Sequence, residues 1–382
     1  GDISITGSGG NPDAAACQQK DVTFTPQTPT VFILVDKSGS GFLTETTGTF
    51  FNLRPAVEQV VMQLQDQVRF GLGSFVGDHA SGTCKLNYQS VPIAQNNYAA
   101  IKAAYDSWGP LLPLGSKADT PMTDAITMVR AALQADTTSG QKYMMVVTDS
   151  ETDFCDDGNH LCPGDAVTGV IQQMYAGTPS IGTLVVGLPS TQSQISTPVL
   201  QNFANAGAGQ PVVLPMGSGA ATIMDVYYQC SGVAPWTALL TAAGKSMTSI
   251  ANYSTTGAGT AKVYTPSGTD TASLTTAISA ALNGVRSCTF DLSTFQIDAD
   301  KLDEAIITLV DSSAGNMDVP LDKNSKNGWY MTDITAVTNA KGQVMHTATQ
   351  VQLYGPWCDK LRSQTTTDIK FNFPCDIIID IN

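Results

Sequence analysis

The chain has 382 residues, more than one ordinary domain usually holds, and this length indicates two domains. Asp and Glu number 33 against 19 Lys and Arg, and the formal net charge is −14. No basic cluster interleaved with aromatic residues occurs, so we do not expect a nucleic-acid partner. No apolar run reaches the roughly 18 residues of a membrane-spanning helix, so we expect membrane attachment only through a lipid anchor preceding Gly1.

The first 20 residues predict a flexible tether. Residues 1–16 are small and polar, and the chain begins without methionine, so we expect that a leader has been removed. Such a segment is typical of the stretch after a lipidated cysteine in a bacterial lipoprotein. An ordinary linker or a cloning remnant explains the same composition equally well.

The pattern from residue 21 to residue 286 predicts a doubly wound α/β domain with a mostly parallel sheet. Asp21 to Phe24 is expected to be an edge strand leading into a central strand at 31–35. An insertion is expected within about 190–262, where either 211–214 or 262–265 is the last strand. The other predicted strands are 68–76, 85–93, 143–148 and 181–188, and the predicted helices are 50–64, 97–108, 122–133, 166–175 and 270–285.

Oxygen-bearing side chains follow the central strand at its carboxyl end. Val31 to Val35 is an unbroken apolar run, as expected of a strand buried on both faces. Asp36, Ser38 and Ser40 come next and form a cluster of hard oxygen donors of the kind that Mg²⁺ prefers. An Asx-turn with serine caps at the start of the next helix is the structural alternative.

Two distant stretches add to this cluster. Thr120 and Pro121 precede a helical pattern, and the apolar run 143–148 ends in Asp149. With Asp36, Ser38 and Ser40, these residues resemble the von Willebrand factor A family, which includes the integrin I domains. Two further positions depart from the commonest family pattern, because Gly41 stands where methionine is usual and Ser150 where glycine is usual. Neither position supplies an expected ligand.

The resemblance implies a metal-ion-dependent adhesion site. Its ligands would be Asp36, Ser38, Ser40, Thr120 and Asp149. They would hold one divalent cation, for which Mg²⁺ is the first candidate and Ca²⁺ and Mn²⁺ are the alternatives. In that family an acidic residue of the binding partner takes the open coordination position. We therefore expect an adhesin, not an enzyme, that binds an acidic ligand or a surface. The alternative is a disulfide-bonded surface or assembly subunit in which the metal is purely structural.

The loop after Asp149 is rich in carboxylates and also contains two cysteines. Its acidic residues could bind a second cation such as Ca²⁺, or simply form a solvated face. Cys155 and Cys162 could close a small loop by a disulfide. The chain has eight cysteines and no Cys-x-x-Cys zinc motif, which predicts disulfides and an oxidising compartment. Other pairings stay open, although Cys288, Cys358 and Cys375 share the C-terminal region.

Residues 287–382 alternate apolar and polar residues over short runs separated by turns, which predicts an antiparallel β-sandwich. Trp329 is expected in its core, with an exposed binding aromatic as the alternative. The whole architecture resembles the integrin αI-like gliding-motility adhesins of myxobacteria. That resemblance implies an outer-membrane lipoprotein at the cell surface that connects the motility machinery of the envelope, at focal adhesions, to the substratum.

Overall fold

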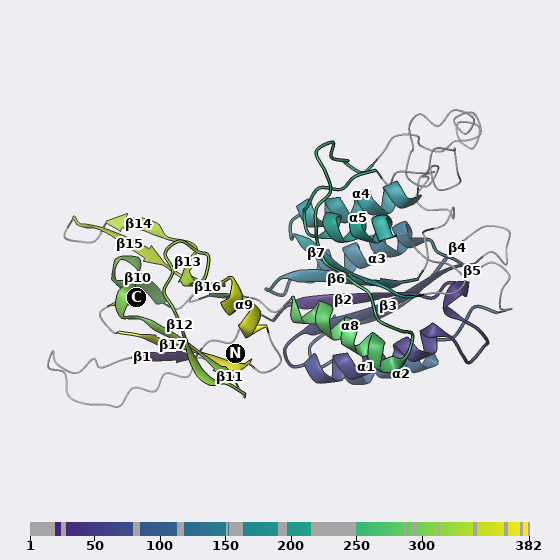
Figure 1. Ribbon diagram of the computed structural model, residues 1–382, viewed down its shortest axis with the longest axis horizontal. Coiled ribbons are helices and arrows are strands. Elements are labelled where there is room, and N and C mark those ends of the chain that lie inside the picture. The colour runs from purple at the N-terminus through teal and green to yellow at the C-terminus, as the bar shows by residue number, and fades with distance from the viewer. Residues whose placement is uncertain are drawn as a thin grey trace. The chain divides into compact units, whose positions relative to one another are not determined.

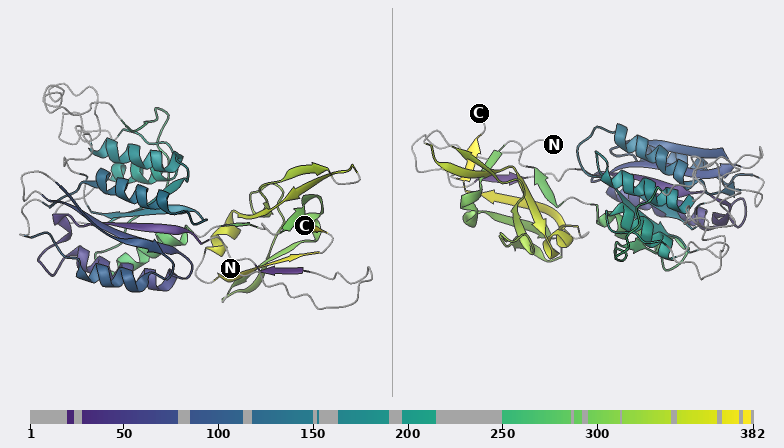
Figure 2. Two further views of the ribbon diagram at one scale, coloured as in Figure 1. Left: turned by 180° about the vertical axis from the view of Figure 1, so that it is seen from behind. Right: turned by 90° about the horizontal axis from the view of Figure 1, so that it is seen from above.

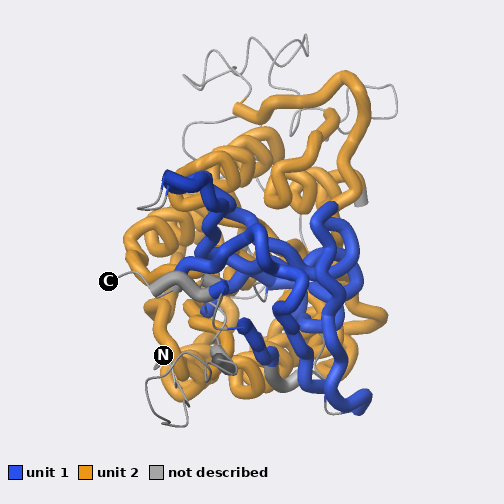
Figure 3. The backbone as a smooth tube through the Cα atoms, turned by 90° about the vertical axis from the view of Figure 1, so that its left-hand side faces the viewer, with its two compact units in different colours: residues 1–28, 283–382 blue, residues 29–282 orange. Residues whose placement is uncertain are grey.

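The computed structural model divides the chain into two compact units, one of residues 29–282 and one of residues 283–382 with the N-terminal residues up to 28 (Figure 3). The structure describes residues 20–23, 28–78, 85–112, 118–149, 152, 163–189, 197–214, 250–285, 288–291, 295–311, 313–338, 342–362, 366–374 and 377–380. Within these ranges, no helix has the length and apolar character needed to cross a lipid bilayer.

The larger unit is built on one mostly parallel sheet with the strand order β4-β3-β2-β6-β7-β8 (Figure 1). The central strand β2 pairs in parallel with β3 on one side and with β6 on the other. Strand β4 and the short β5 pair antiparallel with β3. The strands are β2 (Thr30–Asp36), β3 (Arg69–Asp78), β4 (Lys85–Ala94), β5 (Ala118–Asp119), β6 (Lys142–Thr148), β7 (Ile181–Gly187) and β8 (Val263–Tyr264).

Helices cover both faces of this sheet, so the expected mixed α/β architecture with a mostly parallel sheet is confirmed. Helices α3, α4 and α5 lie on one face, and α1, α2 and α8 lie on the other (Figures 1 and 2). The helices are α1 (Thr49–Leu64), α2 (Tyr98–Ser107), α3 (Met122–Ala135), α4 (Pro163–Ala176), α5 (Thr197–Gly207) and α8 (Thr271–Asn283).

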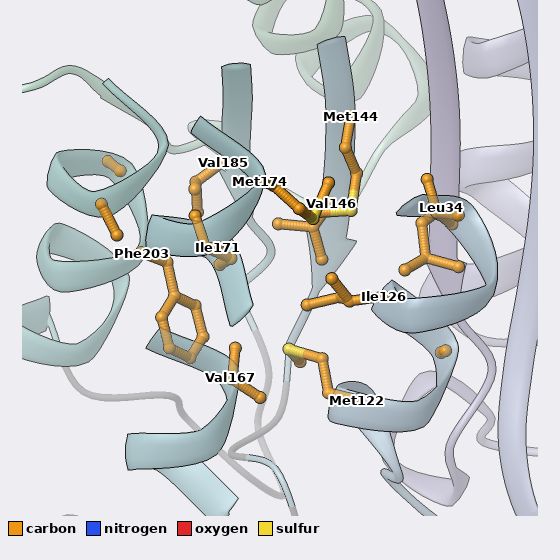
Figure 4. Close-up of a cluster of buried hydrophobic side chains, with 14 of the residues drawn as sticks. Leu34, Met122, Ile126, Met144, Val146, Val167, Ile171, Met174, Val185 and Phe203 are labelled. Carbon is orange, nitrogen blue, oxygen red and sulfur yellow. The ribbon is translucent and has the colours of Figure 1, made fainter. Parts of the chain in front are cut away.

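The apolar run of β2 is buried on both faces, as its sequence predicts. All seven of its residues are buried. On one face, Leu34 packs in a core with Ile126 of α3 and Val146 of β6, and Phe203 of α5 belongs to the same cluster (Figure 4). Burial of this apolar surface stabilises the unit and holds the strand rigidly in the middle of the sheet.

The structure decides between the two segments proposed as the last strand. Val263 and Tyr264 form β8 and pair in parallel with β7, whereas Val212 makes only an isolated bridge to Tyr253. Side-chain amides of α4 and α5 hold the chain that leads to β8. Gln172 exchanges two hydrogen bonds with the backbone of Asn252, with N–O distances of 2.8 and 2.9 Å.

The smaller unit consists of small antiparallel sheets, ordered β1-β17-β11-β12, β14-β15-β10-β18 and β13-β16-β9. Side chains from all three sheets contribute to one core, in which Trp329 is fully buried as expected. The elements are β1 (Lys20–Thr23), β9 (Thr289–Asp291), β10 (Phe295–Asp298), η2 (Ala299–Glu304), β11 (Ile306–Asp311), β12 (Gly315–Val319), β13 (Gly328–Met331), β14 (Thr335–Thr338), β15 (Val344–Ala348), β16 (Gln350–Tyr354), α9 (Pro356–Leu361), β17 (Thr366–Phe373) and β18 (Ile378–Asp380).

A disulfide between Cys288 and Cys358 closes a loop in this unit, with a Cα–Cα distance of 5.6 Å. These are the two cysteines that the described ranges contain, and both are bonded. The prediction that the cysteines are oxidised is confirmed for this pair. The predicted bridge between Cys155 and Cys162 lies outside the described residues.

The prediction for the first strand is wrong. We expected 21–24 to be an edge strand of the α/β domain, but Lys20–Thr23 pairs antiparallel with β17 of the smaller unit. The larger unit begins only at residue 29. A four-residue strand can pair with any open sheet edge, and its sequence does not specify which one.

Candidate functional site

The candidate site lies where β2 and β6 end. The two strands are parallel neighbours, and their paired positions run up to Val35 and Val147. Asp36 is the last residue of β2, and Asp149 comes directly after the last residue of β6. Parallel pairing therefore brings both carboxylates to the same edge of the sheet, where α/β proteins usually bind ligands.

The turn after Asp36 carries the two serines. The backbone N–H of Ser38 donates to Oδ1 of Asp36 at 2.8 Å, and a short 3-10 helix, η1 (Gly39–Gly41), follows. The hydroxyls of Ser38 and Ser40 are 3.2 Å apart, and the Ser40 hydroxyl donates to Oδ1 of Asp149 at 2.9 Å. Hydrogen bonds thus link four of the five predicted ligands, Asp36 through the backbone N–H of Ser38 and the other three through their side chains.

Gly48 allows the chain to return close to this turn. It has a φ of 137°, and a Cβ at this position would lie 2.4 Å from the carbonyl oxygen of Gly41. A side chain would strain the backbone and push the returning chain away from the turn, so this position requires glycine. The glycine is thus one of the features that fix the conformation next to Ser40.

The fifth predicted ligand, Thr120, comes from the other side of β2. Strand β5 pairs with the end of β3 at Gly77 and Asp119, and Thr120 follows β5, two residues before α3 begins at Met122. Its side chain is buried, and its carbonyl oxygen accepts a hydrogen bond from the Thr152 hydroxyl at 3.2 Å. Thr152 lies three residues beyond Asp149, so this contact links the Thr120 segment to the segment that carries Asp149.

Sequence reasoning assigned no role to Thr148. Its hydroxyl donates to Oδ2 of Asp36 at 2.6 Å, and the side chain is fully buried. The signal in the sequence is a hydroxyl-bearing residue at the end of a predicted parallel strand. Its partner follows only from the register between β2 and β6, which the sequence alone does not supply.

The electrostatics of Asp36 are unusual for an aspartate. Burial and, after it, the charge of Asp149 raise the pKa of Asp36 to about 7, while hydrogen bonds from Thr148 and Ser38 act in the opposite direction. Among the described residues, no basic side chain forms an ion pair with Asp36. The adjacent Lys37 instead donates to Oε1 of Gln89 at 2.6 Å, and burial lowers the pKa of Lys37 to about 8.

The spacing of the oxygens fits a small divalent cation. Neighbouring ligands of an octahedral Mg²⁺ with bonds of about 2.1 Å lie about 3.0 Å apart. The Ser38–Ser40 and Ser40–Asp149 oxygen pairs are 3.2 and 2.9 Å apart. In the part of the chain that the structure describes, no group of three or more His, Cys, Asp or Glu residues is placed to hold a metal. This site has only two carboxylates, and its other oxygen ligands would be hydroxyl groups.

The possible second cation site falls outside the described residues. It was expected in the acidic loop after Asp149, and residues 150, 151 and 153–162 are not described. Asp165, the last carboxylate of that stretch, is described and buried. Its carboxylate accepts hydrogen bonds from the backbone of Ile250 and Ala251, at 2.7 and 3.4 Å. Asp165 therefore anchors the chain that leads to β8.

The opposite end of the same sheet holds another carboxylate. Asp136, just after α3, accepts hydrogen bonds from Arg69 at 2.7 Å and from Lys142 at 3.0 Å. Arg69 and Lys142 are the first residues of β3 and β6. Partial burial raises the pKa of Asp136, but these hydrogen bonds outweigh that effect and hold the pKa well below its ordinary value.

Comparison with known proteins gives distant structural likenesses. No protein-family model matches the chain, and no curated protein matches it. The pilus adhesin SpaC of Lactobacillus rhamnosus GG is similar at a TM-score of 0.39 and 14% identity, over 97% of this chain and 42% of SpaC. Proximal thread matrix protein 1 of the mussel byssus gives a TM-score of 0.33 at 14% identity, over 49% of this chain and 47% of that one. The minor pilin PilB of Streptococcus sanguinis gives 0.32 at 12% identity, over 43% of this chain and 50% of that one. The chain thus spans less than half the length of SpaC.

Proposed function

We propose that the larger unit is a von Willebrand factor A domain that binds one divalent cation, Mg²⁺ first, at the carboxyl ends of β2 and β6. Asp36, Ser38, Ser40, Thr120 and Asp149 would hold the ion. When bound, the cation supplies a positive centre with a coordination position open to a carboxylate of a partner. Ca²⁺ and Mn²⁺ accept the same oxygen donors and are the other candidates.

One observation carries this proposal. The backbone N–H of Ser38 holds the Asp36 carboxylate, and the hydroxyls of Ser38 and Ser40 lead in hydrogen-bond steps to the carboxylate of Asp149. Two buried carboxylates repel each other unless a proton or a cation lies between them. A divalent ion removes that repulsion, and neutral hydroxyl ligands leave it electrophilic towards an incoming carboxylate.

We further propose that the protein is a cell-surface adhesin. The disulfide between Cys288 and Cys358 is consistent with an exported protein, since disulfides persist in oxidising compartments. The smaller unit would be a β-sandwich, and the protein would be an outer-membrane lipoprotein. In the narrower form of the proposal, it connects the envelope's gliding machinery to the substratum. We propose binding and not catalysis, because the oxygens of the site are suited to holding a cation.

The second candidate function is a disulfide-bonded surface or assembly subunit whose metal only stabilises the fold. The observation in its favour is the burial of the site, since Asp36 and Asp149 are 6% and 3% exposed. A purely structural metal needs no open position. The two functions therefore differ in whether a change at one ligand affects adhesion or stability.

Thr120→Val separates them, because valine has nearly the same volume as threonine but no hydroxyl. In saturating Mg²⁺, adhesion of the purified protein to carboxylate-coated beads should fall while the melting temperature stays unchanged. The matched control is Thr123→Val, since Thr123 is buried three residues further on and its hydroxyl has no hydrogen-bond partner among the described residues. A lower melting temperature with intact adhesion would favour the structural metal.

A further inference from the structure

Asp36 is held both by the turn that follows it and by the neighbouring strand β6. Its Oδ1 accepts the backbone N–H of Ser38 at 2.8 Å, and its Oδ2 accepts the hydroxyl of Thr148 at 2.6 Å. The second contact comes from β6, and Thr148 lies one residue beyond the last paired positions of β2 and β6. The carboxylate therefore cannot rotate without breaking a short hydrogen bond inside the sheet.

We propose that Thr148 is a positioning residue that makes the site selective for Mg²⁺ over Ca²⁺. This inference rests on the proposed function. The two hydrogen bonds, one on each oxygen, fix the orientation of the Asp36 carboxylate, so it cannot readily rotate to adapt to a larger ion. Bidentate carboxylates are typical of Ca²⁺, which takes 6 to 8 oxygen ligands in flexible geometry, whereas Mg²⁺ requires a near-ideal octahedron.

The contact partner of Thr148 is what gives it this role. Groups that hydrogen-bond to metal ligands fix the orientation of those ligands, and their loss typically weakens metal binding by about 10- to 100-fold. A loosened Asp36 would lose the geometry that Mg²⁺ needs but could adapt to the larger Ca²⁺. The loss should therefore be unequal for the two ions, which a general loss of stability would not produce.

The experiment is calorimetric titration of the full chain with MgCl₂ and, separately, with CaCl₂. For Thr148→Val we expect Mg²⁺ affinity to fall by about 10- to 100-fold and Ca²⁺ affinity to fall less, so that the Mg²⁺/Ca²⁺ affinity ratio decreases. Thr148→Ser keeps the hydroxyl and should retain the native ratio. The control is Thr183→Val, because Thr183 is buried on the neighbouring β7 and its hydroxyl has no hydrogen-bond partner in the described ranges. This control should leave both affinities unchanged.

An unchanged ratio in folded Thr148→Val, or an equal loss for both ions, would overturn the inference while leaving the proposed metal site in place. If the native chain bound neither ion, the proposed function would fail and this inference with it. If Thr148→Val did not fold, Thr148→Cys would take its place, since a thiol is only a weak donor. Native Mg²⁺/Ca²⁺ selectivity in Thr148→Cys would then overturn the inference, and reduced selectivity would support it.

Discussion

Each end of the larger unit's sheet holds an aspartate, but the groups around the two carboxylates differ in charge. At the amino end, Asp136 contacts the side chains of Arg69 and Lys142. At the carboxyl end, Asp36 accepts hydrogen bonds from a backbone N–H and from the hydroxyl of Thr148, which are neutral groups. Asp36 is buried, with 6% of the residue exposed, whereas Asp136 is partly buried, with 10% of its side chain exposed.

This difference in neighbouring charge indicates a structural role for the amino end and a cation-binding role for the carboxyl end. The chain itself supplies the positive charge next to Asp136, so that cluster joins the starts of β3 and β6 and needs nothing from outside. At the other end, the negative charge of Asp149 adds to that of Asp36 and raises its pKa. A carboxylate in that state is stabilised by an added cation, which is why we place the metal at the carboxyl end.

The largest predicted effect on stability comes from removing the charge at the amino end. Asp136→Asn leaves the charges of Arg69 and Lys142 largely buried without their partner, and it should lower the free energy of unfolding by about 3 kcal/mol. Urea unfolding followed by circular dichroism measures this. The exposed Asp106→Asn, which removes a surface pair with Lys102, should lower it by less than about 1 kcal/mol. Equal effects of the two variants would contradict our view of the amino end.

The pH dependence of stability should have opposite signs at the two ends. The pKa of Asp36 is higher in the folded chain than its ordinary 3.8, so the metal-free folded protein binds extra protons between about pH 4 and pH 7. Its contribution to stability therefore falls as the pH rises through that window. Asp136 has a lowered pKa when folded, and its contribution is lost only as the pH falls below about 4.

Urea unfolding in EDTA from pH 4.5 to pH 7.5 tests this sign. The native chain should lose stability relative to Asp36→Asn as the pH rises, and saturating Mg²⁺ should abolish that loss because the cation favours the ionised carboxylate. If native and Asp36→Asn proteins showed parallel curves in EDTA, the raised pKa of Asp36 would be refuted.

The smallest predicted effect concerns the threonine at the amino end. The hydroxyl of Thr30 donates to Oδ2 of Asp136 at 3.3 Å and accepts from Arg69 at 3.1 Å. Thr30→Val should lower the free energy of unfolding by about 1 to 2 kcal/mol, because two hydrogen bonds of modest net strength are lost. Calorimetry should show native Mg²⁺ affinity, in contrast to Thr148→Val at the other end. A weakened Mg²⁺ affinity in Thr30→Val would mean that the two ends are coupled.

The strands that carry the site could be predicted because strands buried on both faces consist of unbroken apolar runs. An apolar run that ends abruptly in aspartate identifies both β2 and β6, and the helical spacing between them identifies α1 and α3. These features are local, so one sequence is enough to predict them. The gathering of Asp36, Ser38, Ser40 and Asp149 is not local, and it was expected only from the resemblance to the von Willebrand factor A motif.

Features that depend on pairing between distant segments could not be predicted. The contact between Thr148 and Asp36 requires the register of two strands 112 residues apart in sequence. The pairing of β1 with β17 joins opposite ends of the chain. Strand β8 has only two residues, so its pattern did not distinguish it from 211–214. In each case the pairing depends on which strand edge is free and on the register of the two strands. The pattern of residues along one strand does not specify either.

The most direct test of the metal site is a Mg²⁺ titration of the native chain and of Asp36→Asn, followed by calorimetry at pH 7.5. Asparagine keeps the shape of aspartate but removes one of the two charged ligands, so we predict one Mg²⁺ per native chain and no measurable binding by the variant. Circular dichroism in EDTA should show that the variant is folded and at least as stable as the native chain, since a buried charge has been removed. Unchanged Mg²⁺ affinity in a folded Asp36→Asn would contradict the metal site at the carboxyl end of the sheet.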